Sequence, residues 1–221
     1  MIDLLKKKSI PFVKKNSCPC CLNNATKIID LPDYPITEFY TSMPLKDGLF
    51  GFFDQSVLFC QECDHLFLDT ILDPNIIYNN YLTSTNSSKG AVDCLNSFRS
   101  FILKTTELHD FSSVIDIGGN DSSFLELFDS NLENLINIDV NASAKLEKVI
   151  ANKRSWAEVD FEEYIYDKPR IFTSIHTFEH VDEPIYFIEK ISNKRKTDDL
   201  FYFQFPSLEL ISNHKRFDQL C

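Results

Sequence analysis

The stretch VIDIGGNDSSFLELF, residues 114–128, decides the fold that this sequence predicts. It begins with residues 114–117, a short apolar run of the kind that forms a buried strand. Gly118 and Gly119 then interrupt the run, and residues 122–128 have the apolar spacing of a helix. The stretch therefore predicts a strand, a tight turn and a helix, and glycine in such a turn lets the backbone approach a ligand closely.

Strand-like and helix-like segments continue to alternate along the chain. Further apolar runs with strand character lie at residues 135–138, 171–175 and 200–205, and a weaker run lies at 156–160. Apolar residues recur at helical spacing at residues 90–108, 142–150 and 183–191. Strands that alternate with helices are typical of a parallel sheet with helices on both faces. The sequence therefore predicts an α/β fold with a doubly wound, mostly parallel sheet.

An acidic residue lies where a doubly wound fold would use it to bind a nucleoside. Asp139 follows the predicted strand at 135–138, about 20 residues beyond the glycines, the spacing at which a carboxylate meets ribose hydroxyls. The turn lacks the third glycine of a pyrophosphate fingerprint and the chain has no P-loop lysine, which disfavours a dinucleotide or a nucleoside triphosphate. S-adenosylmethionine has ribose hydroxyls and no phosphate, so it fits better. An ordinary turn with a helix-capping Asp139 is the alternative.

The predicted cofactor-binding residues lie at the ends of the predicted strands. Asp116 is expected to contact the methionine amino group, directly or through water. Asp160 or Phe161, after the weak strand, is expected to contact adenine. The full predicted set is Asp116, Gly118, Gly119, Asn120, Asp121, Asp139 and Asp160.

Two C-x-x-C pairs in the N-terminal part predict a metal site. The pairs are Cys18 with Cys21, in CPCC, and Cys60 with Cys63, in CQEC. Structural Zn²⁺ prefers four thiolate or imidazole ligands in a tetrahedron, and two such turns supply four thiolates. Four thiolates leave no open coordination position, so the predicted zinc is structural. The alternatives are Cys20 in place of an outer cysteine, His65 as a ligand, and unrelated buried thiols or a redox pair.

These patterns divide the chain into three parts. Residues 1–75 are predicted to form a small, β-rich zinc-binding module, with strand-like runs at 27–29 and 56–59. A loop-rich module of this size needs a staple, and a metal supplies one. Residues 76–89 are predicted to be a linker or a loop that covers the substrate, and residues 90–221 the cofactor-binding domain.

Composition narrows the partners and the compartment. The 221-residue chain has a formal net charge of −11, and an acidic chain repels phosphate backbones, so nucleic acid is not an expected partner. No segment is apolar over a length that would cross a membrane, and no signal-peptide pattern follows the N-terminal lysines. Without a signal peptide, the seven cysteines are better explained as thiols or metal ligands than as disulfides. We therefore expect a cytoplasmic protein.

Together, the motifs resemble those of the bacterial sugar C-methyltransferases. In that family an N-terminal zinc-binding module precedes a class I, Rossmann-like, S-adenosylmethionine-dependent methyltransferase domain. The resemblance covers almost the whole chain and depends on the order and spacing of the motifs. They are the two C-x-x-C pairs, LDP at 72–74, YLTST at 81–85, IGGND at 117–121, HTFEHV at 176–181, FPS at 205–207 and FDQ at 217–219.

The resemblance implies an enzyme that transfers a methyl group from S-adenosylmethionine to a nucleotide-linked sugar or related glycan precursor, as in surface polysaccharide synthesis. His180 matches the family's histidine and is expected to act as the base or to orient the substrate. His176 is expected to line the cofactor pocket, and Glu179 to orient His180. The residues expected to close over the acceptor are Tyr78, Tyr81 and Ser84; a linker packed on the sheet is the alternative.

The chain departs from the family at two points. Ser122 stands where the family has glycine, which is acceptable if the backbone there is ordinary. The chain ends at Cys221, where the family continues into a Tyr-His-Glu-His motif, so the sheet is expected to lack its last strands and to expose an edge that can pair with another copy. The alternative functions are a catalytically incomplete methyltransferase paralogue, serving as a metal-stabilised binding protein, and a zinc-ribbon adaptor for protein or nucleic acid.

Overall fold

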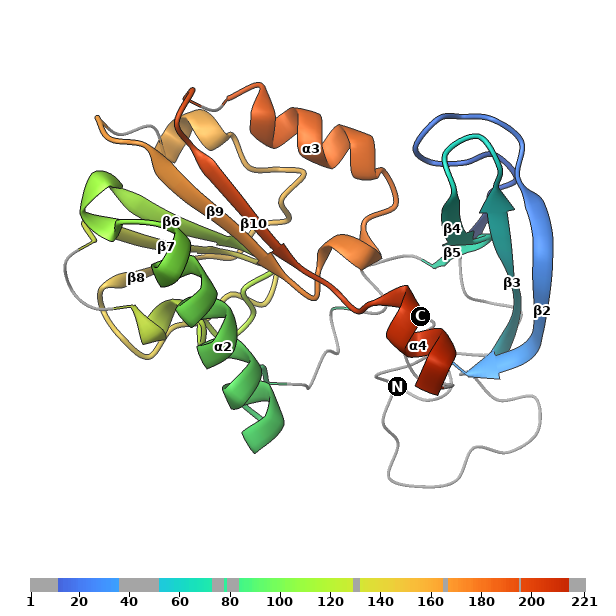
Figure 1. Cartoon of the computed structure of the whole chain (residues 1–221), viewed down its shortest axis with the longest axis horizontal. Coiled ribbons are helices and arrows are strands. Elements are labelled where there is room, and N and C mark those ends of the chain that lie inside the picture. Colours follow the sequence, from blue (N-terminus) through green and yellow to red (C-terminus); the bar gives the residue numbers. More distant parts are fainter. Residues whose placement is uncertain are drawn as a thin grey trace. The chain divides into compact units, whose positions relative to one another are not determined.

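The computed structural model describes residues 12–35, 52–72, 78, 84–128, 132–164, 167–194 and 196–214 (Figure 1). The chain divides into two compact units. The first comprises Met1–Leu82 with Asp182–Ile185 and Asn213–Cys221, and the second comprises Thr83–Val181 with Tyr186–Ser212. Within the described ranges, none of the helices combines the length and the apolar character needed to cross a lipid bilayer.

The first unit is built from antiparallel strands. Its larger sheet has the order β2-β3-β4, and β1 pairs separately with β5. The strands are β1 (Phe12–Lys14), β2 (Thr26–Pro35), β3 (Phe52–Cys60), β4 (His65–Leu68) and β5 (Thr70–Leu72). The predicted β-rich character of this part is thus confirmed.

The described residues of the first unit bury few apolar side chains. The buried aliphatic side chains among them are Val57 and Leu58, whereas Phe12, Val13 and Ile28 are more than half exposed. These side chains give the described strands little hydrophobic stabilisation, and in small modules a bound metal is a common further source of stability.

The second unit contains a five-stranded sheet in which every neighbouring pair is parallel. Its strands are β6 (Ser113–Ile117), β7 (Asn134–Ile138), β8 (Val149–Asn152), β9 (Arg170–Ile175) and β10 (Leu200–Gln204). The spatial order is β10-β9-β6-β7-β8, so the chain starts at the centre, builds one half outward and then crosses back. Doubly wound nucleotide-binding sheets have this order, and their ligands bind at the switch point, here between β6 and β9. The predicted parallel α/β sheet is confirmed.

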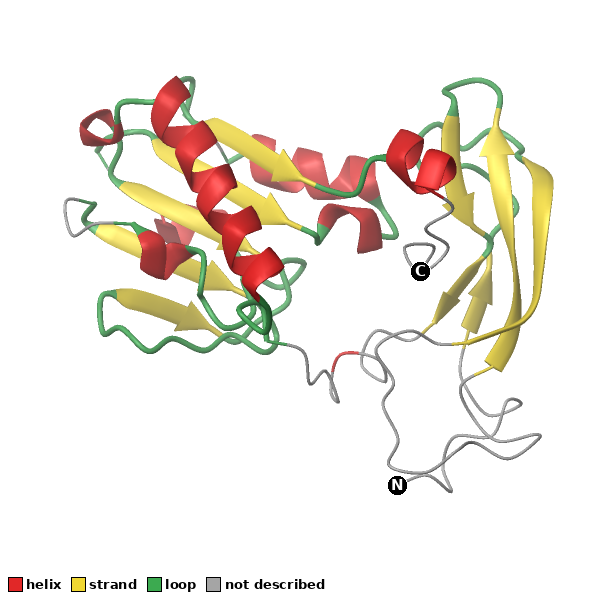
Figure 2. Cartoon of the chain, turned by 60° about the horizontal axis from the view of Figure 1, so that its bottom comes forward, coloured by secondary structure: helices red, strands yellow, loops and turns green. Residues whose placement is uncertain are grey.

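Helices cover both faces of this sheet, as Figure 2 shows. They are α2 (Lys89–Thr105) and α3 (Pro184–Ser192). Ile102 of α2 packs on the face that includes Val114, and Phe187 of α3 packs on the face that includes Ile115. Val114 and Ile115 are consecutive residues of β6, and consecutive strand residues point to opposite faces. Each face of the sheet is therefore apolar and covered.

Two of the predicted helices are wrong. Residues 122–128 hold only a short 3-10 helix, η3 (Leu125–Leu127). Residues 142–150 hold no α-helix, because β8 begins within them. Only residues 139–148 are left to join β7 to β8, and a crossover with a helix needs a dozen or more. In the described residues, the connections from β6 to β7 and from β7 to β8 are mostly irregular.

The predicted weak strand at 156–160 is also wrong. The strand that follows β6 and β7 in the parallel sheet is β8, and most of residues 156–160 form a turn. Trp156 and Val159 are three residues apart, a spacing that does not fit the two-residue alternation of a strand. The remaining elements are η2 (Leu108–Asp110), η4 (Phe161–Tyr164), η5 (Phe178–His180) and α4 (Leu208–His214).

Candidate functional site

Four cysteine side chains of the first unit lie close enough to hold one metal ion. The Sγ atoms of Cys18, Cys21, Cys60 and Cys63 all lie within 4.8 Å of one another. The Cys21–Cys60 sulfurs are 3.4 Å apart, the Cys18–Cys63 sulfurs 3.5 Å and the Cys21–Cys63 sulfurs 3.7 Å. Sulfurs bound tetrahedrally at about 2.3 Å from zinc are about 3.8 Å apart, so the spacing suits a tetrahedral ion. The four cysteines can bind a metal ion such as zinc.

The two cysteine turns have matching backbones. The Cys60/Cys63 turn is the hairpin loop between β3 and β4. In each turn the residue after the second cysteine has a left-handed conformation, with φ 63° at Leu22 and 55° at Asp64. The two C-x-x-C turns therefore share a backbone feature, and they bring their sulfurs together around one point.

Backbone amides surround the sulfurs. The amide two residues after each cysteine donates to that cysteine's sulfur, and the donors are Cys20, Asn23, Glu62 and His65. Hydrogen bonds to sulfur favour the thiolate, which is the form that a metal binds. Cys20 and His65, the alternative ligands, lie outside the group of four and contribute amides to it. A metal ion held by all four thiolates would have no open position for a substrate.

In the second unit, the glycine turn follows β6 at the switch point of the sheet. Gly118 has φ +80°, a conformation that residues with a Cβ rarely adopt. A Cβ on Gly118 would lie 2.0 Å from Thr177 Oγ1, and one on Gly119 would lie 2.6 Å from Asn137 Oδ1. The two glycines therefore let the turn pack closely on β7 and on the segment after β9.

Two residues of this turn other than glycine are also left-handed. Asn120 has φ 45° and Ser122 has φ 62°. Ser122 is buried, and its hydroxyl donates to Ser143 O at 2.5 Å and accepts from Asn137 Nδ2 at 2.8 Å. The condition under which serine would replace glycine without cost, an ordinary backbone, is therefore not met, and the hydrogen bonds offset a conformational cost of about 1–2 kcal/mol. Backbone strain of this kind gathers at functional sites.

Asp139 lies directly after β7 and faces the glycine turn. Its Oδ2 accepts the amide of Asn120 at 3.1 Å, and its Oδ1 accepts the amide of Asn141 at 2.6 Å. Burial raises the pKa of this carboxyl, while the two amides oppose that effect. Each carboxylate oxygen has a second lone pair that can accept a hydroxyl. Asp139 is thus held at the carboxyl edge of the sheet, where ligands of doubly wound folds bind.

A row of buried polar side chains lies beneath the turn. Thr173, Asp116 and Asn137 are cross-strand neighbours on β9, β6 and β7, and Thr173 Oγ1 donates to Asp116 Oδ1 at 2.7 Å. Asn137 Nδ2 donates to Asn120 O and Ser122 Oγ, both at 2.8 Å, which fixes the orientation of the amide. Asn137 Oδ1 is buried and accepts no hydrogen bond from the described residues. Sequence analysis missed Asn137 and Thr173, although a polar residue inside an apolar strand was a visible signal.

Asp116 is buried beside Asn137. Asp116 Oδ2 and Asn137 Oδ1 both lie within 2.7 Å of the point that a Cβ of Gly119 would occupy, and Asp116 is only 2% exposed. Burial, with a smaller contribution from the Asp139 charge, raises the pKa of Asp116 to about 7, although the Thr173 hydroxyl lowers it. The side chain predicted to contact methionine therefore faces the protein interior.

We expect Asp116 to make the protein less stable as the pH rises. The folded state holds a proton that the unfolded state releases near pH 4, so the free energy of unfolding should fall by up to about 4 kcal/mol between about pH 4 and 7 and then level off. Asp116→Asn should lack this slope, because its amide does not titrate and can still accept the Thr173 hydroxyl. Urea denaturation of both proteins across this range measures the difference. Parallel pH profiles would contradict a protonated Asp116.

The histidines follow β9 at the same edge of the sheet. His176 has φ 49°, and its amide donates to Gln204 O at 2.8 Å. His176 Nδ1 lies 3.3 Å from Glu179 Oε1, so the carboxylate contacts His176. The orientation of His180 by Glu179 stays a prediction. His180 ends η5 and is exposed. His176 and Glu179 thus form a partly exposed acid–base pair next to Thr177, which packs on Gly118.

Of the residues predicted to cover the acceptor, one lies beside the glycine turn. Ser84 donates its hydroxyl to Asp121 Oδ2. Tyr78 is half-buried and belongs to the first unit. Tyr81 lies outside the described residues. The carboxylate of Asp121, predicted to bind cofactor, therefore binds the segment before α2.

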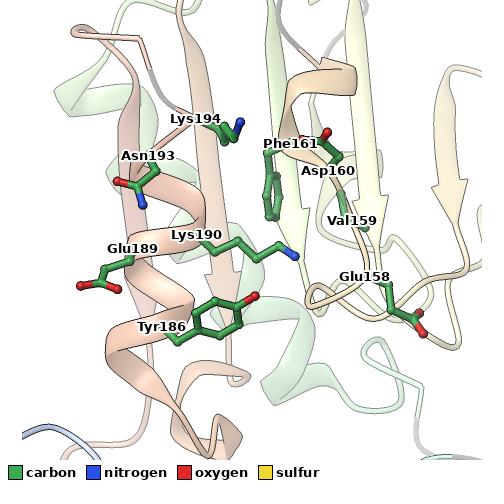
Figure 3. Close-up of a pocket in the computed structure, with 9 residues that line it drawn as sticks. All are labelled: Glu158, Val159, Asp160, Phe161, Tyr186, Glu189, Lys190, Asn193 and Lys194. Carbon is green, nitrogen blue, oxygen red and sulfur yellow. The ribbon is translucent and has the colours of Figure 1, made fainter.

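Asp160 lines a separate cavity on the α3 side of the sheet. The cavity has a volume of about 400 Å³ and lies between α3 and the segment after β8 (Figure 3). Asp160 Oδ1 accepts the amide of Glu162 at 3.0 Å and so caps η4. Lys190 reaches from α3 across the cavity and donates to Ala157 O. The contact with adenine predicted for Asp160 stays a prediction.

No protein-family model matches this chain, and no curated protein matches its sequence. Its function is therefore argued from the site. The structure brings the glycine turn, Asp139 and the His176–Glu179 pair to the carboxyl edge of one parallel sheet. This arrangement provides a closely packed turn, a carboxylate for hydroxyl groups and a partly exposed base, which together can position a nucleoside and remove a proton from a second molecule.

Proposed function

We propose that the second unit is an S-adenosylmethionine-dependent methyltransferase domain that acts on a nucleotide-linked sugar or a related glycan precursor, and that zinc stabilises the first unit. The observation that carries this proposal is Asp139, fixed against the glycine turn at the switch point of the sheet. A carboxylate in this position suits ribose hydroxyls. The sugar acceptor is inferred from the motif resemblance to the sugar C-methyltransferases.

Each part of the site has a role in the proposed reaction. When bound, S-adenosylmethionine supplies an electrophilic methyl group on a sulfonium sulfur. The Asp139 carboxylate would accept hydrogen bonds from the ribose, and the backbone of the glycine turn would lie against the cofactor. His180 or His176 would take the proton that the acceptor loses, and Glu179 holds Nδ1 of His176 so that Nε2 can receive it. The remaining contribution is the orientation of donor and acceptor.

A direct test is calorimetric titration with S-adenosylhomocysteine, the demethylated product of the cofactor. We expect wild-type protein to bind it, and Asp139→Ala to weaken binding by about 1–3 kcal/mol, because the ribose hydroxyls lose their acceptor. Asp167→Ala is a matched control, since Asp167 is an exposed aspartate of the same unit. No binding by folded wild-type protein would refute the proposal.

The second candidate is a catalytically incomplete paralogue that binds a ligand without turning it over. The left-handed, strained Ser122, where the related enzymes have glycine, favours this candidate. Binding of S-adenosylhomocysteine without methyl transfer to any of a panel of nucleotide sugars would support it. Transfer of isotopically labelled methyl to one of them would exclude it.

A further inference from the structure

The Asp121 carboxylate joins two segments of the second unit that are far apart in sequence. It accepts the Ser84 hydroxyl at Oδ2, the amide of Ser123 at Oδ1, 3.1 Å away, and the amide of Asn86. Ser123 belongs to the glycine turn, whereas Ser84 and Asn86 lie just before α2. One side chain thus ties the start of α2 to the turn.

Both sides of this connection are held in place. On the turn, Asp121 lies between the left-handed residues Asn120 and Ser122, and Asn137 donates a hydrogen bond to each of them. The backbone that carries the Asp121 side chain is therefore fixed from below by β7.

On the other side, residues 84–88 form a compact turn that continues into α2. Ser84 Oγ lies 2.8 Å from Asn86 Oδ1, and Ser84 O accepts the amide of Ser87 at 3.0 Å. Ser88 caps α2 by accepting the amide of Ala91 at 3.1 Å. Movement of this turn would therefore break its hydrogen bonds to Asp121.

The chemistry of the carboxylate suits an anchor. Although burial opposes it, the hydrogen bonds from Ser123, Ser84 and Asn86 lower the pKa of Asp121, so the group is charged at neutral pH. Hydrogen bonds to a charged acceptor are shorter and about twice as strong as those between neutral groups.

We propose that Asp121 is a positioning residue that fastens residues 84–88 to the glycine turn. Ligand binding at the turn is then coupled to the ordering of residues 84–88, which include Ser84, one of the residues predicted to close over the methyl acceptor. The coupling rests on the proposed function; the fastening itself does not. Coupling between two sites is reciprocal. If a ligand at the turn orders residues 84–88, then loosening that segment must weaken the binding of the ligand.

The first experiment is amide hydrogen exchange without ligand. Asp121→Ala should speed exchange of the Asn86 and Ser87 amides by about tenfold or more, and Ser84→Ala should do so to a smaller extent. Ser97→Ala is the matched control, since Ser97 is an exposed serine of α2 whose hydroxyl bonds within its own helix. Equal exchange in wild-type protein and in both anchor variants would overturn the proposal. Since no ligand is present, this result is independent of what the turn binds.

The second experiment is a double-mutant cycle in affinity for S-adenosylhomocysteine. Ser84→Ala should weaken binding several-fold in wild-type protein and have no further effect in Asp121→Ala, because both remove one connection. Equal effects in the two backgrounds would mean that Ser84 acts without Asp121 and would overturn the coupling. If wild-type protein binds no S-adenosylhomocysteine, the methyltransferase proposal and this coupling fail, while the exchange result still decides whether Asp121 is the anchor.

Discussion

Removing zinc from the protein with a strong chelator is expected to unfold the first unit and leave the parallel sheet folded. The described residues of the first unit bury few apolar side chains, whereas binding of a structural zinc contributes about 10–16 kcal/mol to folding in small modules. Trp156 is the only tryptophan of the chain and packs on Phe187 of α3, with ring centroids 4.9 Å apart. Its fluorescence therefore reports on the second unit. Chelation should change the far-ultraviolet circular dichroism and expose the first unit to protease, with little change in this fluorescence.

Single cysteine variants show whether the four sulfurs act as one site. Loaded with cobalt(II), wild-type protein should show the visible absorption of a tetrahedral thiolate complex. Cys18→Ser should lose most of this absorption, since its sulfur lies 3.5 Å from that of Cys63. Cys20→Ser should retain it, because the Cys20 side chain is outside the group and its backbone amide is unchanged. A Cys20→Ser protein as damaged as Cys18→Ser would contradict this ligand set.

The other large effect is expected at Arg170, whose guanidinium is fully buried at the start of β9. It lies 2.7 Å from Asp199 Oδ2, in an ion pair in which both side chains are 0% exposed. It also stacks on the Phe172 ring, with a distance of 4.9 Å to the centroid. The backbone carbonyls that accept from it belong to Phe161, Tyr164 and Lys194. One side chain thus joins η4, β9, the end of α3 and the start of β10.

We expect Arg170→Met to lower the free energy of unfolding of the second unit by about 3–5 kcal/mol, since it leaves Asp199 as a buried charge without its partner. Urea denaturation followed by Trp156 fluorescence measures the loss. Arg154→Met is the matched control: Arg154 and Glu163 are 2.6 Å apart but well exposed, and exposed ion pairs contribute little. Adding Asp199→Asn to Arg170→Met should restore part of the loss. Similar losses in the two arginine variants would show that burial does not set the cost.

Much of this architecture could be predicted from short patterns. The central strands are apolar runs, and the two C-x-x-C pairs are local motifs whose geometry needs only a hairpin around them. The connections after β6 and β7 could not be predicted in the same way. Their helical periodicity is real. After β7, however, the start of β8 at Val149 leaves too little chain for a helix, and that boundary is set by pairing with β7.

The sequence predicted where the residues of the candidate site lie along the strands, but it did not predict what their side chains contact. Asp139 lies where the spacing placed it. The directions of Asp116, Asp121 and Glu179 were not predictable, because each is set by a partner distant in sequence or by local backbone conformation. Asp116 faces Thr173 across the sheet, Asp121 faces Ser84, and the left-handed backbone of His176 accompanies its approach to Glu179.

The buried row beneath the glycine turn also limits how the strands can slide past one another. The apolar runs of β6, β7 and β9 are alike enough that a shift of two residues would keep the same faces buried. Such a shift would place Asp116 opposite Ile171 or Ile175 of β9, or opposite Leu135 or Asp139 at β7. The buried polar side chains would then lose their neighbours, at a cost of several kcal/mol. Thr173, Asp116 and Asn137 therefore select a single alignment of the three central strands. The glycine turn packs on Asn137 and Thr177, so a chain with a mispaired sheet would not form the candidate site.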